Sequence, residues 1–185
     1  ICGWLMNEIG VDAVYLDQIA AARPLPCLNR AHAHRPGGGS WWQYAYYNLL
    51  DHLHEITPPE HGYTTECNAE VYMRKIQSYL TWHWTEGGQV PAFPAVYAGY
   101  IGMFGLCYTA DTINHLRVLM GQSFLFGEQM GWISPRGYLD SPYRDLYRKL
   151  ARARYEYRDW FVRGTMRRPP EISCDAQPIT APCHM

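Results

Sequence analysis

Two acidic side chains could form one catalytic site, because each of them ends a short apolar or β-branched run. Asp17 closes the run in GVDAVYLDQI, and Glu66 closes the run in GYTTECN. In a parallel α/β sheet, acids placed in this way gather at the carboxyl ends of the strands, where active sites are built. Two carboxyl groups that face one pocket can cleave a glycosidic bond. One protonates the leaving oxygen, and the other attacks the anomeric carbon or activates water. We therefore predict that Asp17 and Glu66 are a catalytic pair, with the two roles left open.

Polar and aromatic side chains close to predicted strand ends are candidates for contacts with a sugar. Gln18 and Asn68 follow the two acids, and the loop CLNRAHAHRPGGGS carries two histidines. We expect His34 to hydrogen-bond a sugar hydroxyl or Asp17. Aromatic rings suit stacking on carbohydrate as well as packing in a core. The predicted substrate-binding residues are Gln18, His32, His34, Asn68, Tyr97, Glu128 and Trp132.

The same loop also offers metal ligands. Cys27, His32 and His34 could bind a metal together with Asp17 and serve a metal-dependent hydrolase. Their spacing matches no strong zinc pattern. The sequence therefore predicts neither a metal nor another cofactor, and the metal-dependent hydrolase is kept as an alternative.

The composition limits the classes of partner. The 185 residues include 16 basic and 17 acidic side chains, for a formal net charge of −1. This balance argues against nucleic acid and against an anionic membrane surface as partners. No apolar run approaches the ~20 residues that a membrane span requires. Aromatic residues make up 15% of the chain, which favours a carbohydrate, either a small sugar or a glycan, as the partner.

Hydrophobic patterns predict four strands, each followed by a helix. The strands are expected at residues 12–16, 62–65, 92–98 and 123–126. Ser40 and Gln43 form a capping-box pattern at the start of the first helix. A second helix is expected from Asn68 through Leu80. A third is expected to begin at Thr109 or Asp111 and to carry Ile113, Leu116 and Met120, and the last runs from Ser141 to just before Gly164.

The spacing of the strands indicates the architecture. Their centres lie 50, 31 and 31 residues apart, compared with about 31 residues per unit in an eight-unit barrel of ~250 residues. We predict an α/β fold, with residues 1–165 forming the C-terminal half of a (β/α)8 TIM barrel. Half a barrel leaves open strand edges, so the chain is expected to be a fragment whose missing N-terminal half is its partner. A small doubly wound fold is the alternative. Residues 166–185 are predicted to be a tail that begins another module.

Four strings resemble a family of bacterial proteins that is known only as an uncharacterised domain in the glycoside-hydrolase TIM-barrel clan. They are VDAVYLDQIA, HAHRPGGG, TTECNAE and FLFGEQMGWI, and the resemblance covers roughly residues 1–165. It implies a glycosidase-like function in which Asp17 and Glu66 match the strand-end acids of the family. It also implies that the four strands are the fifth to eighth of a barrel and that the tail leads to a β-rich C-terminal domain.

In the α-galactosidase and α-glucosidase relatives of this barrel, the catalytic acids lie on the fourth and sixth strands. Here the two acids are on adjacent units, so the resemblance does not assign their roles. A carbohydrate-binding barrel without catalysis is the second hypothesis. An extracellular or periplasmic location is favoured over the cytoplasm.

Overall fold

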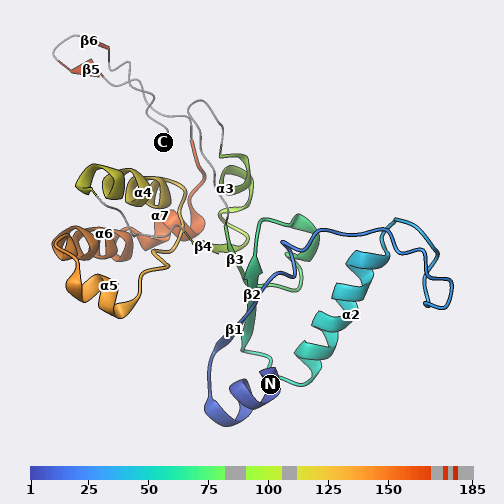
Figure 1. Cartoon of the computed structure of the whole chain (residues 1–185). Coiled ribbons are helices and arrows are strands. Elements are labelled where there is room, and N and C mark those ends of the chain that lie inside the picture. Colours follow the sequence, from blue (N-terminus) through green and yellow to red (C-terminus); the bar gives the residue numbers. More distant parts are fainter. Residues whose placement is uncertain (82–90, 106–111, 168–172, 175–176, 179–185) are drawn as a thin grey trace. The chain divides into compact units, whose positions relative to one another are not determined.

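The computed structural model describes residues 1–81, 91–105, 112–167, 173–174 and 177–178 (Figure 1). The fold is mixed α/β. Strands β1 (Ala13–Leu16), β2 (Gly62–Glu66) and β3 (Ser78–Leu80) form a parallel sheet in chain order, and β4 (Gly102–Phe104) follows later in the chain. The chain divides into two compact units, Ile1–Leu80 and Thr81–Met185. We call them the first and the second unit.

The first unit begins with a helical segment and contains strands β1 to β3. Helix α1 (Cys2–Trp4) continues into a π-helical turn, η1 (Leu5–Ile9), and Gly10 ends it at a φ of 79°. Strands β1 and β2 pair in parallel, as do β2 and β3. Every residue of β2 except Thr64 is buried, whereas β1 alternates between exposed and half-buried positions. The first two predicted strands are therefore confirmed.

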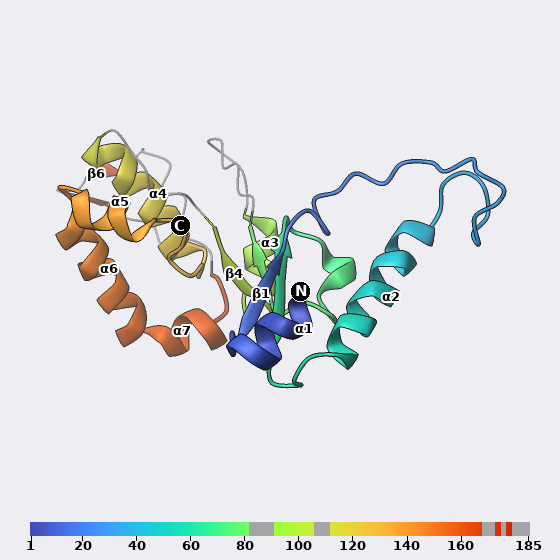
Figure 2. The same cartoon turned by 60° about the horizontal axis from the view of Figure 1, so that its bottom comes forward.

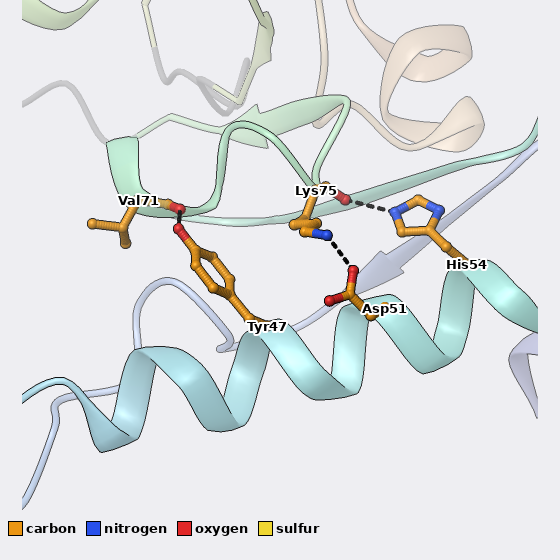
Figure 3. A network of polar contacts seen from close by, with 5 residues as sticks. All are labelled: Tyr47, Asp51, His54, Val71 and Lys75. Carbon is orange, nitrogen blue, oxygen red and sulfur yellow. Dashed lines mark hydrogen bonds and ion pairs between the residues drawn. The ribbon is translucent and has the colours of Figure 1, made fainter.

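Helix α2 (Trp41–Glu55) confirms the predicted helix, with Ser40 at its N-cap. The predicted capping box is wrong, because the Ser40 side chain makes no cap hydrogen bond and Gln43 donates to the Tyr47 hydroxyl instead. Its Leu50 is fully buried, and three polar contacts tie the helix to the segment between β2 and β3 (Figure 3). The Tyr47 hydroxyl donates to the Val71 carbonyl, and the Lys75 ammonium pairs with Asp51. His54 Nε2 donates to the Lys75 carbonyl at 2.9 Å. Helix α2 is thus attached both by apolar burial and by this network.

The helix predicted from Asn68 through Leu80 is wrong. The segment instead contains a 3-10 turn, η2 (Glu70–Tyr72), followed by strand β3. Asn68 caps no α-helix, because the turn starts after Ala69. The spacing of apolar residues in this segment matches that of a helix. A strand of three residues is too short to show the alternation that would have identified it.

The predicted strands at 92–98 and 123–126 are also wrong, because both segments are helical. Helix α3 (Ala92–Tyr97) contains Pro94 in its first turn, where a missing N–H costs no intrahelical bond. Helix α4 (Ile113–Leu125) extends through the apolar run SFLF to its C-cap at Phe126. A short apolar run does not distinguish a strand from a buried helix face.

The second unit has a helical core. Leu116 and Met120 of α4 pack with Tyr147, which belongs to helix α6 (Arg144–Glu156). The predicted last helix is divided into α6 and a separate α7 (Arg158–Arg163) (Figure 2). Its predicted start is wrong, because α6 has Tyr143 at its N-cap, whereas Ser141 ends a further helix, α5 (Pro135–Asp140). Gly164 follows α7 as predicted. In the tail, β5 (Ser173–Cys174) pairs antiparallel with β6 (Gln177–Pro178). Among the residues described, no helix is long and apolar enough to cross a membrane.

Two glycines are expected to respond in opposite directions to substitution by alanine. A Cβ on Gly164 would lie 2.1 Å from the Trp160 carbonyl oxygen, whereas a Cβ on Gly121 in α4 meets nothing within 4 Å. Gly164→Ala should therefore destabilise the protein by about 1–3 kcal/mol. Gly121→Ala should stabilise it by about 0.5–1 kcal/mol, because alanine loses less backbone entropy in a helix. Denaturant unfolding of both variants measures the difference, and equal effects would contradict it.

Candidate active site

The two candidate acids follow neighbouring parallel strands at the same level. Leu16 of β1 pairs with Thr65 of β2, and Asp17 and Glu66 are the residues immediately after this pair. Neighbouring strands lie about 4.8 Å apart. The register therefore places the backbones of Asp17 and Glu66 side by side at the carboxyl end of the sheet, as the sequence suggested.

The backbone turns in the same unusual way at both strand ends. Gln18, after Asp17, has a φ of 65°, and Cys67, after Glu66, has a φ of 68°. Left-handed backbone is uncommon outside glycine and costs about 1–3 kcal/mol, and residues of this kind gather at functional sites. Such strain fits a site in which holding each side chain in a fixed direction outweighs the cost in folding free energy.

Two hydrogen bonds connect the acids to their surroundings. Gln18 Nε2 donates to Glu66 Oε2 at 2.7 Å, and the Tyr15 hydroxyl donates to Asp17 Oδ1 at 3.3 Å. Glu66 is 6% exposed, whereas Asp17 and Gln18 are exposed. The pair thus combines one buried carboxyl group with one that solvent reaches.

The charges at these strand ends hold two neighbouring groups in their neutral forms. Burial, followed by the charges of Glu66 and Asp17, raises the pKa of Tyr15 above its usual value. Burial and the charge of Glu66 likewise raise the pKa of the Cys67 thiol. At neutral pH the Tyr15 phenol is therefore a hydrogen-bond donor to Asp17, and Cys67 is not a thiolate.

Asn68 presents an unpaired acceptor beside the acids. Its Oδ1 is buried and has no hydrogen-bond partner. Buried polar atoms are nearly always paired, so each exception requires an explanation. Because Asn68 does not cap a helix, its carboxamide oxygen stays available for a ligand hydroxyl.

The histidine loop makes contacts of its own near the start of α2. His34 Nδ1 donates to the Arg35 carbonyl at 2.9 Å, and its ring stacks on Trp41 with centroids 4.4 Å apart. His32 Nδ1 lies 3.2 Å from Cys27 Sγ. In Figures 1 and 2 the loop runs away from the strands towards the first turn of α2. His34 thus contacts its own loop and Trp41 rather than Asp17.

The remaining predicted site residues belong to the second unit. Glu128 is fully buried, where Thr81 Oγ1 donates to its Oε1 at 2.5 Å and Ser123 Oγ donates to its Oε2 at 3.2 Å. Trp132 is 54% exposed, and half-buried Tyr97 at the end of α3 packs against Phe93. Glu128 therefore fixes the chain locally, whereas the ring of Trp132 is accessible.

Comparison with known proteins places the chain in a family. Residues 1–108 match the family model described as "Domain of unknown function (DUF6259)". The chain belongs to this DUF6259 family. No solved structure matches it.

Two curated relatives of this DUF6259 member carry a functional name. The chain is 35% identical over 147 residues to "Putative glycoside hydrolase 22789" of Monosiga brevicollis, and 34% identical over 137 residues to a "Putative glycoside hydrolase" of Bacteroides thetaiotaomicron. The alignments cover 75% and 71% of this chain. They cover 12% and 20% of the two relatives, so the chain spans only a small part of each.

The sequence analysis missed three side chains that donate hydrogen bonds to the predicted acids in this DUF6259 chain. They are Tyr15, which contacts Asp17, and Thr81 and Ser123, which contact Glu128. Tyr15 could have been found, because residues two apart on a strand lie on the same face. The contact of Thr81 with Glu128 could not have been predicted, because 47 residues separate the two in the sequence and only the fold brings them together.

Raised pKa values predict that the first unit of this DUF6259 chain loses stability in alkali. Burial raises the pKa of Tyr63, Tyr72 and Tyr79. Their neutral forms stabilise the fold fully below about pH 10, and this contribution is lost as the pH rises from there through the higher folded-state values. Each group changes the free energy of unfolding by at most about 1.4 kcal/mol per pH unit. Urea unfolding between pH 9 and 11, as an experimental range, should show a shallower loss in Tyr79→Phe than in the parent. Identical slopes would contradict the prediction.

Proposed function

We propose that this chain carries the catalytic carboxylate pair of a glycoside hydrolase, with Asp17 and Glu66 as the two acids. The observation that carries the proposal is the parallel register of Leu16 with Thr65, which sets both acids at one level of neighbouring strands. The names of the two curated relatives support the same class of reaction. The left-handed residues after both acids fit a site that holds its side chains in fixed directions.

The spacing favours retention of configuration at the anomeric carbon. Retaining enzymes hold their carboxyl groups about 5–5.5 Å apart, and inverting enzymes about 6.5–9.5 Å apart. Neighbouring parallel strands about 4.8 Å apart suit the shorter separation. We assign nucleophilic attack to the solvent-exposed Asp17 and proton transfer to Glu66. In the first step Asp17 bonds to the anomeric carbon while Glu66 protonates the leaving oxygen. Water then releases the sugar, with Glu66 as base.

Three neighbouring groups would support this chemistry. The Tyr15 hydroxyl donates to Asp17 and would orient its carboxylate. The amide of Gln18 would orient Glu66 through the 2.7 Å hydrogen bond. The unpaired Oδ1 of Asn68 would accept a hydrogen bond from a sugar hydroxyl.

The proposed scaffold is the C-terminal half of a (β/α)8 barrel. Parallel strands in chain order and helices between them are consistent with such a barrel. In this proposal the rest of the longer protein supplies the other strands and the opposite wall of the sugar site. The isolated chain should then be inactive.

The test uses the full-length protein and a panel of aryl glycosides and oligosaccharides. Asp17→Asn and Glu66→Gln should abolish turnover. Asp12→Asn and Glu70→Gln are matched controls, because both residues are exposed acids near the ends of the same elements. A sugar that binds, measured by calorimetry, but is never hydrolysed would support a carbohydrate-binding barrel instead.

A further inference from the structure

The loop before α2 brings three metal-binding side chains together. The cluster comprises Cys27, His32 and His34, and one ligand atom from each lies within 4.8 Å of the others. The distance from Cys27 Sγ to His32 Nδ1 is 3.2 Å. Ligands of a tetrahedral zinc ion, with Zn–S near 2.3 Å and Zn–N near 2.0 Å, lie about 3.5 Å apart. Cys27 and His32 are already about as close as two ligands of one ion, so the remaining adjustment is to bring His34 closer to them, by at most about 1.3 Å.

The ring of His34 is already oriented for coordination. A carbonyl oxygen can only accept, so the 2.9 Å contact with the Arg35 carbonyl places the proton on Nδ1. The lone pair of Nε2 is then free for a metal. Stacking on Trp41, at an interplanar angle of 9°, fixes the plane of the ring. Outer contacts of this kind are typical of histidine ligands.

His32 can bind through Nδ1 after one local change. Its Nε2 lies 3.0 Å from the Asn29 carboxamide nitrogen, and Asn29 Oδ1 accepts from the Ala31 N–H at 2.9 Å. Metal on Nδ1 leaves a proton on Nε2, so the carboxamide must rotate to present its oxygen to that proton. The rotation gives up one exposed hydrogen bond, at a cost of about 1 kcal/mol.

The loop has little else to hold it in place. No residue from 20 to 40 is buried, and Leu25 and Leu28 are 61% and 76% exposed. An isolated bridge between Cys27 and Gly37 closes the loop through two backbone hydrogen bonds. This bridge sets Cys27 opposite the end of the turn that carries both histidines. Metal binding supplies folding free energy where apolar burial is small.

We propose that Cys27, His32 and His34 bind one Zn²⁺ ion that orders this loop. The cysteine loses its proton and binds as a thiolate, both histidines bind neutral, and water takes the fourth position. One sulfur and two nitrogen ligands without a carboxylate favour Zn²⁺ over Mg²⁺ or Ca²⁺. The site is independent of the proposed glycosidase activity, because neither Asp17 nor Glu66 belongs to it.

The test titrates the chelator-treated full-length protein with Co²⁺ and then with Zn²⁺. We expect a thiolate-to-cobalt charge-transfer band and displacement of Co²⁺ by Zn²⁺. Cys27→Ser should remove the band. His32→Gln and His34→Gln should weaken Zn²⁺ binding by at least about a hundredfold. His52→Gln is the matched control, because His52 is an exposed histidine on α2 outside the cluster.

Two results would overturn the site. One is a Co²⁺ spectrum without the thiolate band in the parent protein. The other is Zn²⁺ affinity in the three ligand variants equal to that of His52→Gln. Protease cleavage within residues 20–40 gives a second readout, since Zn²⁺ should slow it in the parent and not in Cys27→Ser. Neither measurement requires hydrolytic activity, so failure of the glycosidase proposal would leave them unaffected.

Discussion

Asp17→Asn is expected to lower kcat for glycoside hydrolysis at least about a thousandfold in the full-length protein, because the variant cannot form the covalent intermediate. The asparagine keeps the size of the side chain and can still accept from Tyr15, so folding should be unchanged. The loss should be equally large for every leaving group, since attack on the anomeric carbon precedes all products. Asp12→Asn should stay within about twofold of the parent, as expected for an exposed position away from the site.

Glu66→Gln is expected to produce a loss that depends on the leaving group. A general acid contributes about 10²–10⁴-fold when the leaving oxygen needs a proton. An aryl glycoside with an acidic phenol leaves without that proton, so this substrate should lose far less than an alkyl glycoside. Measuring kcat/KM, which reports the first step, for both substrates in both variants separates the roles.

The opposite pattern would exchange the roles of the two acids. Turnover like that of the parent in both variants would remove the pair as catalytic residues. Proton NMR of the first product gives an independent check of the carboxyl spacing. Release of the inverted anomer would contradict the short separation that we infer from neighbouring strands.

The sequence correctly predicted the elements whose start or end signals agree with their hydrophobic pattern. Helix α2 has a start signal at Ser40 and a helical apolar pattern up to the proline pair at Pro58. Strands β1 and β2 are β-branched or apolar runs that end on Asp17 and Glu66. The register between them made the two acids neighbours, and the sequence had also placed them on adjacent units.

The sequence-based prediction failed where a short apolar run fits either a strand or a buried helix face. The segment around Pro94 was predicted to be a strand, but the first turn of a helix accepts proline. The end of α4 was also predicted to be a strand, in a stretch where three apolar residues follow Ser123. The helix predicted to carry Ile113, Leu116 and Met120 is confirmed, because α4 contains all three residues. The error was to end this helix before Ser123, which continues its buried face at helical spacing.

Glu128 shows how burial distinguishes a structural acid from an acid that contacts substrate. Its position after an apolar run predicted a contact with substrate, but the structure buries it completely between two hydroxyl groups. A buried carboxyl group with two donors is expected to fix the chain after α4. Stability and kinetic measurements on variants of Glu128 test this role.

Glu128→Ala is expected to destabilise the protein by about 3–5 kcal/mol. The change leaves a cavity and removes the acceptor of the Ser123 hydroxyl, and an unsatisfied buried group costs about 1–3 kcal/mol. The Thr81 hydroxyl keeps the Phe104 carbonyl as an acceptor. Glu128→Gln keeps the volume and one good acceptor, so its cost should be about 1–2 kcal/mol. Ser123→Ala removes one of the two donors and should fall in the same range. Thermal and urea unfolding of the three variants measure this order.

Comparing the loss of stability with the loss of activity in these variants distinguishes a structural role of Glu128 from a catalytic one. If Glu128 is structural, Glu128→Gln should unfold earlier than the parent while kcat and KM of the folded enzyme stay near their parent values. If it contacts substrate, Glu128→Gln should instead raise KM or lower kcat with little change in stability. A conservative amide is the decisive variant because it preserves the packing around Thr81 and Ser123 while removing the carboxylate charge. A parent-like unfolding curve for Glu128→Ala would contradict the structural role outright, since a fully buried side chain cannot be removed without cost.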